Sequence, residues 1–188
     1  MAEKKIGGKI VLEGETQYRS ALKNIKSEQA QLRSEMKLCT STFRDSQNSV
    51  EALQKKHEIL TRQIETQEKK VELHRAALAK STAAEETAAQ KVEDLQLAYK
   101  NACVKMDEMR QNSDTSKEAL AQQEKTVQDL KEKLATAEKG YEGISRKTES
   151  YSTSLNYAEA DLQDMQKELK KTDSYMDEAE KSTSGCAE

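Results

Sequence analysis

The sequence predicts an all-α protein of long, extended coiled-coil helices, preceded by one short N-terminal β-strand. The chain has 188 residues, of which 35% are hydrophobic and 35% charged, with one Phe, no Trp and no Pro. So few large apolar groups do not fill a thick core at normal packing density. A chain without proline that is rich in Ala, Gln, Glu, Lys and Leu favours helix. The third observation is a hydrophobic repeat that runs through most of the chain.

Residues 1–14 differ from the rest, and we interpret them as a leader made of a strand and a turn. Gly7, Gly8 and Gly14 lie here, around the β-type run from Ile10 to Glu13. Gly8 and Gly14 are separated by five residues and Glu15 follows, so the GxxxxGK[ST] pattern of a phosphate loop is absent. Because a lone strand is marginally stable, we expect it to pair with another chain or region.

Residues 15–181 carry one heptad frame, whose inward positions we call the seam. One set of seam positions recurs every seven residues from Tyr18 to Ala179 and the other from Leu22 to Met176. Apolar residues occupy 35 of these 47 positions, and the frame does not slip. A strict 3.5-residue repeat predicts helices that supercoil around partner helices.

Two polar stretches predict interruptions of the helix, near residues 44–49 and 112–116. Both are crowded with Ser, Thr, Asn and Asp, whose side chains compete for backbone hydrogen bonds. The pattern Thr115–Glu118 is a capping box, which favours the start of a new helix. The sequence leaves open whether the chain continues straight or reverses as a hairpin at each interruption. Residues 182–188 are expected to fray.

Polar residues interrupt the seam, and two of them are histidines. His57 and His74 are 17 residues apart, too far for one helix to bring both to one metal ion. Copies of each histidine that meet around a helical axis form one candidate metal or anion site. The interpretation we favour is that polar seam residues fix the register between helices. The same interpretation applies to Gln29, Gln67, Gln123 and Glu85.

The composition argues against several other functions. No catalytic, cofactor-binding or metal-binding residue is predicted, and Met106 and Met109 are interpreted as seam fillers. The net charge of −3, with its one basic cluster in the leader, predicts no nucleic-acid partner. No apolar run is long enough to cross a membrane. The three widely spaced cysteines, Cys39, Cys103 and Cys186, suit reduced thiols in a cytoplasm-like environment better than disulfides or zinc.

Four stretches resemble the tape-measure proteins of long-tailed bacteriophages and prophages of Gram-positive bacteria. The most specific is IGGKIVLEGETQYRSALKNI at residues 6–25, followed by LRSEMKLCTSTF at residues 32–43. The other two are SVEALQKKHEILTRQIETQEKKVELHRAAL at residues 49–78 and SLNYAEADLQDMQKEL at residues 154–169. The likeness is weaker between Ala79 and Gly143.

The resemblance implies a structural component of the phage tail and not an enzyme. Family members lie extended in the lumen of the tail tube as a few parallel copies, and they set tube length in proportion to their own length. We therefore expect a parallel homo-oligomer that assembles with tail-tube, tail-tip and tail-chaperone proteins, located in the virion and, during assembly, in the host cytoplasm.

Two further expectations accompany the resemblance. Family members are usually much longer than this chain and often carry membrane-active or cell-wall hydrolase regions. We expect the chain to correspond to the N-terminal region of a longer protein or to a shortened remnant, so those two activities do not carry over. The alternative is a cytoplasmic coiled-coil scaffold or spacer of the host.

Overall fold

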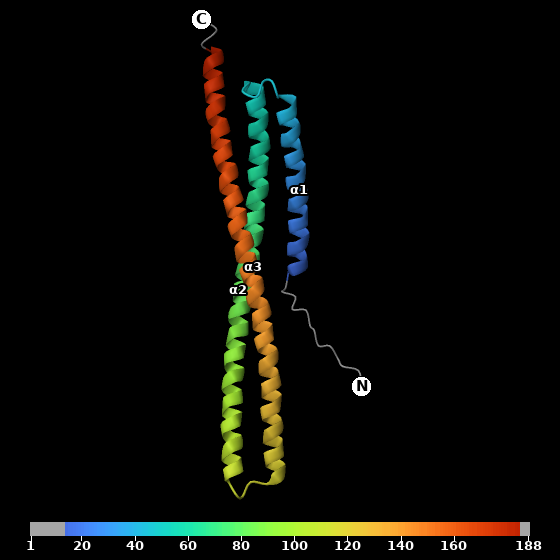
Figure 1. The fold of residues 1–188 in the computed structure, drawn as a ribbon, viewed down its shortest axis with the longest axis vertical. Coiled ribbons are helices and arrows are strands. Elements are labelled where there is room, and N and C mark those ends of the chain that lie inside the picture. Colours follow the sequence, from blue (N-terminus) through green and yellow to red (C-terminus); the bar gives the residue numbers. More distant parts are fainter. Residues whose placement is uncertain (1–13, 185–188) are drawn as a thin grey trace, which may run out of the picture. The chain divides into compact units, whose positions relative to one another are not determined.

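The structure, a computed structural model, describes residues 14–184 and is helical throughout, apart from two turns. Its elements are α1 (Glu15–Thr42), α2 (Val50–Gln111) and α3 (Lys117–Ser184) (Figure 1). This confirms the all-α prediction for the described part of the chain. The predicted strand, from Ile10 to Glu13, lies outside the described residues.

α1 begins directly after Gly14, whose φ is 86°. This left-handed conformation is open to glycine without the steric penalty of a Cβ atom. The Tyr18 N–H donates to the Gly14 carbonyl at 2.9 Å and closes the first turn. At the other end of the chain, α3 continues to Ser184, and the rest of the segment expected to fray, residues 185–188, lies outside the described residues.

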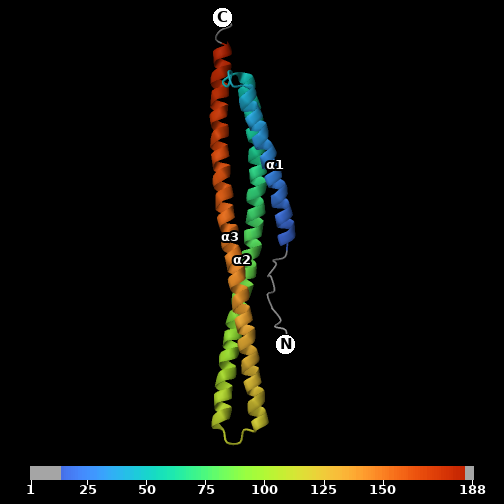
Figure 2. The same cartoon turned by 45° about the vertical axis from the view of Figure 1, so that its right-hand side comes forward.

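The two interruptions span residues 43–49 and 112–116, and the chain reverses direction at each of them (Figures 1 and 2). A serine side chain caps each new helix. Ser49 Oγ accepts from the Ala52 N–H at 3.2 Å, and Ser116 Oγ accepts from the Ala119 N–H at 3.1 Å. These bonds satisfy backbone donors that a helix start leaves without a partner. The capping residue of α3 is thus Ser116, one position after the start of the predicted capping box.

The described chain divides into two units. The three-helix unit contains residues 14–77 and 151–184, and the hairpin unit contains residues 78–150. In the three-helix unit α1 and α3 each run antiparallel to α2, since partner numbers fall along α2 as they rise along α1 or α3. Pairs that show this are Tyr18–His74, Gln29–Gln67 and Arg62–Glu35 for α1, and Arg75–Glu159 and Lys56–Glu168 for α3.

The core of the three-helix unit is built from seam residues. Fourteen of the eighteen buried residues of the described chain occupy seam positions. Three of the other four, Ala52, Ile59 and Thr66, form a second buried column with a spacing of seven residues on α2. A helix that packs against two neighbours buries a wider face than one that packs against a single partner. The single seam predicted from the sequence does not include this column.

The hairpin unit has a much thinner core. Within residues 78–150 the buried side chains are Ser81, Ala102 and Gln123, which are small or polar. Leu97 and Val104 are 60% and 51% exposed on the outer face of α2. A cavity of about 880 Å³ lies between α2 and α3 where small residues meet. Its lining includes Ala88, Ala137 and Gly140.

Candidate functional site: hydrogen-bonded polar groups along the seam

Gln67 links all three helices of the three-helix unit. Its side chain is fully buried, and its Oε1 accepts from Gln29 Nε2 of α1 at 2.6 Å. Its Nε2 donates to the Ala158 carbonyl of α3 at 2.7 Å. Burying an amide without partners is unfavourable, so a shift of either neighbouring helix would leave these groups unsatisfied. The predicted register role of Gln29 and Gln67 therefore has a direct geometric basis.

His74 forms a second polar group near the N-terminal end of α1. The histidine is 3% exposed, and its Nδ1 lies 2.9 Å from the Tyr18 hydroxyl. Tyr18 in turn packs edge-to-face on Tyr151 of α3, with ring centroids 5.1 Å apart. Which of the two groups donates in this hydrogen bond depends on the tautomer of the imidazole. The contact joins α1, α2 and α3 through one histidine and two tyrosines.

The surroundings of this group shift two pKa values. Burial lowers the pKa of His74, and the nearby Lys70 and Lys26 ammonium groups lower it further. Burial, followed by the Tyr151 hydroxyl, raises the pKa of Tyr18. Both shifts favour the neutral forms of the two side chains.

Two further seam bonds lie in the hairpin unit. Gln123 Nε2 donates to the Ala102 carbonyl across the hairpin at 2.8 Å. The hydroxyls of Ser81 and Thr148 are 2.8 Å apart and also join α2 to α3. No buried side-chain oxygen or nitrogen in the described part of the chain is left without a partner. Polar seam residues thus tie the helices at discrete levels in both units.

The remaining candidates are placed differently. The side chain of His57 is 41% exposed and contacts Asp173 of α3 at 3.2 Å, so the structure does not bring it together with His74. Glu85 is half-buried. Among the described residues, no group of three or more His, Cys, Asp or Glu side chains has the arrangement of a metal site. Neither histidine is therefore part of a candidate metal centre within one copy of the chain.

The sulfur-containing candidates are partly covered. Cys39 is buried at the seam of α1 and Cys103 is half-buried on α2, both as free thiols. Cys186 lies outside the described residues. Met106 and Met109 are half-buried on α2, in agreement with a role as seam fillers.

Ion pairs between helices of the three-helix unit show a consistent polarity. In five such pairs α2 supplies a Lys or Arg cation, while α1 and α3 supply carboxylates. The pairs are Lys56–Glu168, Arg62–Glu35, Lys69–Glu28, Lys70–Asp161 and Arg75–Glu159. The hydrogen bond from Lys56 lowers the pKa of Glu168. Exposed pairs stabilise weakly, so their main effect is on which helix faces α2 and in which direction.

A comparison with protein-family models, curated proteins and solved structures finds no match to this chain. The resemblance to tape-measure proteins therefore remains a proposal. No helix of the described residues is long and apolar enough to cross a membrane. The polar groups along the seam join neighbouring helices by hydrogen bonds in both units.

Proposed function

We propose that the chain is a structural component of a bacteriophage tail, the N-terminal region of a tape-measure protein that helps to set tail length during assembly. The observation that carries the proposal is the combination of the motif at residues 6–43 with a seam that keeps one frame from Tyr18 to Ala179. The motif gives the likeness to the family. The unbroken seam gives a physical basis for a protein that sets length.

A helix measures length because each residue adds a constant rise. The 162 residues from Tyr18 to Ala179 would span about 240 Å as one continuous helix, at about 1.5 Å per residue. Both turns are short, and α2 and α3 are already 62 and 68 residues long. In this proposal the protein lies in the lumen of the tail tube, after assembly in the host cytoplasm with tail-tube, tail-tip and tail-chaperone proteins.

The proposal includes parallel self-association as a coiled coil. In the single chain, seam residues such as Leu32, Leu60 and Val71 are buried against the chain's own helices. The same residues are suited to partner helices from other copies, because a seam is recognised by its spacing and not by its chain of origin. Opening of the two turns would exchange contacts within the chain for contacts between copies.

A host scaffold or spacer is the second candidate, and one observation favours it. The antiparallel pairing satisfies the seam of the three-helix unit inside one chain, with hydrogen bonds at Gln67 and His74. A protein that acts as a folded spacer needs no further copy to bury these residues. Its function would then rest on the folded helices, and not on an extended form.

Mass spectrometry of purified tail particles distinguishes the two candidates. Cells that carry the gene are induced for phage production, and tails are separated from the soluble host fraction. We expect peptides of this chain in the tail fraction, in several copies for each tail, and in constant proportion to the tail-tube protein. Tails that lack the chain, with the protein confined to the host fraction, would exclude the tail role and support the spacer.

A further inference from the structure

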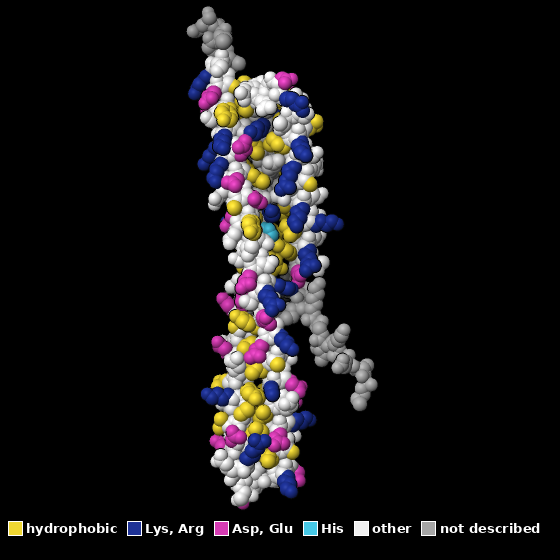
Figure 3. Space-filling view, in the orientation of Figure 1, with side chains coloured by type: hydrophobic (Ala, Val, Ile, Leu, Met, Phe, Trp, Pro, Cys, Tyr) yellow, Lys and Arg dark blue, Asp and Glu magenta, His cyan; other side chains and the backbone are white. Residues whose placement is uncertain are grey.

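One side of α1 carries a row of exposed residues, most of them basic, which we call the basic stripe. It follows two heptad positions along the helix and into the next turn, with steps of three and four residues. Its eight positions are Lys23, Lys26, Ala30, Arg33, Lys37, Thr40, Arg44 and Gln47. Five are basic and none is acidic, and all eight are exposed. Figure 3 shows Lys and Arg side chains gathered along α1.

No carboxylate of the described residues forms an ion pair with the stripe. α1 contains three carboxylates, and each is paired with a residue outside the stripe. The pairs are Glu15–Arg19, Glu28–Lys69 and Glu35–Arg62. Within the residues that the structure describes, the five cations of the stripe have no ion-pair partner. Their charge is therefore directed to solvent or to a ligand.

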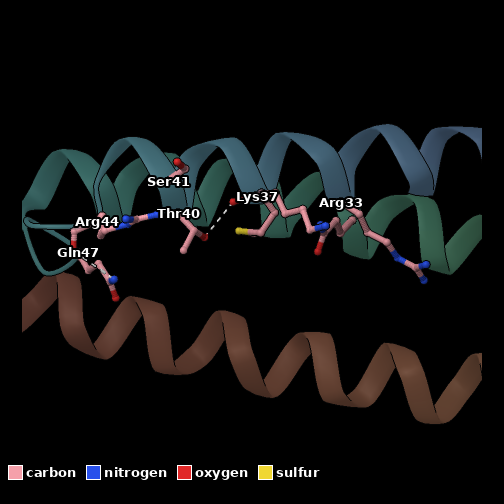
Figure 4. A pocket seen from close by; sticks show the side chains of 8 residues that line it. Arg33, Lys37, Thr40, Ser41, Arg44 and Gln47 are labelled. Carbon is pink, nitrogen blue, oxygen red and sulfur yellow. Dashed lines mark hydrogen bonds between the residues drawn. The ribbon is translucent and has the colours of Figure 1, made fainter.

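A cavity of about 680 Å³ lies along the second half of the stripe. Arg33, Lys37 and Arg44 contribute to its wall, with no carboxylate among the lining residues. Neutral donors complete the lining, namely Thr40, Ser41, Gln47 and Gln63. In Figure 4 the labelled side chains of Arg33, Lys37, Thr40, Arg44 and Gln47 lie in a row along α1 and the following turn. Asp45, the neighbour of Arg44 in the sequence, does not line the cavity.

We propose that the basic stripe binds the phosphate backbone of a nucleic acid without sequence specificity. Arg, Lys, Ser, Thr and Gln are the side chains that contact phosphate oxygens, and these residue types make up the cavity wall apart from Met36. The lining has no aromatic residue on which a base stacks. From Lys23 to Lys37 the stripe spans about 21 Å, enough for several consecutive phosphates.

The same features argue against an acidic helix as the ligand. A helix that docks in a groove is held by apolar anchors at helical spacing. The lining offers Met36 as its apolar side chain, and the stripe itself adds Ala30. The expectation of no nucleic-acid partner rested on the net charge of the whole chain, whereas the stripe is a property of one face. The segment 151–184, with eight carboxylates and four lysines, opposes polyanions, so we expect weak and salt-dependent binding.

Fluorescence anisotropy with labelled nucleic acids tests the proposal on the full chain. The probes are a duplex DNA and a single-stranded DNA of about 20 nucleotides each, measured between about 50 and 200 mM salt. We expect binding at the lower salt that weakens steeply as salt rises. The two probes show whether the stripe takes duplex or single strands. Failure to bind either probe at about 50 mM salt overturns the proposal.

The decisive variant is Arg33→Gln/Lys37→Gln/Arg44→Gln. We expect at least a tenfold loss of affinity. With the duplex probe the slope of log K against log salt should fall by about 2.7, since each phosphate contact on duplex DNA contributes about 0.9. All three sites are exposed, and Gln is a good helix former at the two sites that lie in α1, Arg33 and Lys37, so circular dichroism should show unchanged helicity. If the triple variant does not fold, each single substitution should lower the slope by about 0.9.

The matched control is Lys105→Gln/Lys125→Gln/Lys131→Gln in the hairpin unit, which changes the net charge equally at exposed sites. It should retain the binding of the unmodified chain. An equal loss of binding in the control would overturn the proposal, because the effect would then come from net charge. Labelled poly-L-glutamate that binds more tightly than both nucleic acids, and loses binding in the stripe variant, would identify a surface for acidic proteins and also overturn it. None of these binding results tests the proposed role in the phage tail.

Discussion

Individual buried polar residues explain why a uniform-looking seam adopts one register. Leu and Val side chains at seven-residue spacing pack nearly as well after a shift of one heptad. Gln67 would not tolerate such a shift, because its amide forms hydrogen bonds with Gln29 on one side and with the Ala158 carbonyl on the other. Leaving a buried polar group without its partner costs about 1–3 kcal/mol. The polar seam residues therefore select one alignment among many of similar hydrophobic content.

His74 makes the stability of the three-helix unit dependent on pH. Because burial and the charges of Lys70 and Lys26 lower its pKa in the folded chain, the unfolded chain binds more protons below the ordinary histidine pKa of about 6.5. The stabilising contribution of neutral His74 is complete above that pH and is lost as the pH falls through the folded-state pKa. A single proton gives a slope of at most about 1.4 kcal/mol per pH unit.

We expect the free energy of unfolding to fall as the pH decreases from about 7.5 to 5.5, and His74→Gln to remove most of this decrease. Urea unfolding followed by circular dichroism at several pH values measures it. His57→Gln is the matched control, because the His57 side chain is 41% exposed. It should keep the pH dependence of the unmodified chain. An unchanged pH dependence in His74→Gln would contradict the assignment.

At the scale of the element, the helix starts are specified by single serines. α2 and α3 follow turns in which few other side chains hold the backbone, and Ser49 and Ser116 each accept a hydrogen bond from the helix they precede. The residues that follow are similar in the two cases, Val50-Glu-Ala-Leu53 and Lys117-Glu-Ala-Leu120. Both helices therefore begin in the same way, with a serine that caps the first turn.

Replacing either capping serine by alanine should destabilise the protein by about 1 kcal/mol, as for other N-cap residues. Urea unfolding of Ser49→Ala and Ser116→Ala tests this. Ser113→Ala is the matched control, because Ser113 is an exposed serine in the same turn as Ser116 and should change stability by less than about 0.5 kcal/mol. If the control and the cap variants lose equal stability, the caps are not what begins these helices.

The sequence predicts where the helices lie, but it says less about which helices pack against each other. The seam and the lack of proline predict helices, and the helices end and begin at the polar stretches. A heptad repeat does not record which chain supplies the facing helix, so the reversals at residues 43–49 and 112–116 were left open. The second buried column of α2, from Ala52 to Thr66, follows from packing against two helices. Its seven-residue spacing was the available signal for a second partner.

The sequence likewise identifies some residues of the candidate site but not the groups that they contact. The polar seam residues Gln29, Gln67 and Gln123 were identified from the frame, because a polar residue at a seam position stands out against its neighbours. Their partners, such as the Ala158 carbonyl, depend on the fold. The basic stripe was missed because charge was counted over the whole chain. A helical projection of residues 23–37 places four of its five cations on one face.

At the scale of the whole molecule, we propose that the chain contributes to the length of a phage tail. The most direct test removes two heptads from α2, residues 84–97, and two from α3, residues 132–145, in the phage that encodes the chain. Both deletions preserve the seam frame, and they remove segments that face each other in the hairpin unit. Lengths of many tails are then measured by electron microscopy.

If the chain lies extended in the tail, the loss of these residues should shorten the tail by about 42 Å, at about 1.5 Å for each residue removed. A deletion phage that makes tails of unchanged length would contradict the claim. A control phage carries the same number of substitutions at exposed positions outside the seam and no deletion. Its tails should keep the original length.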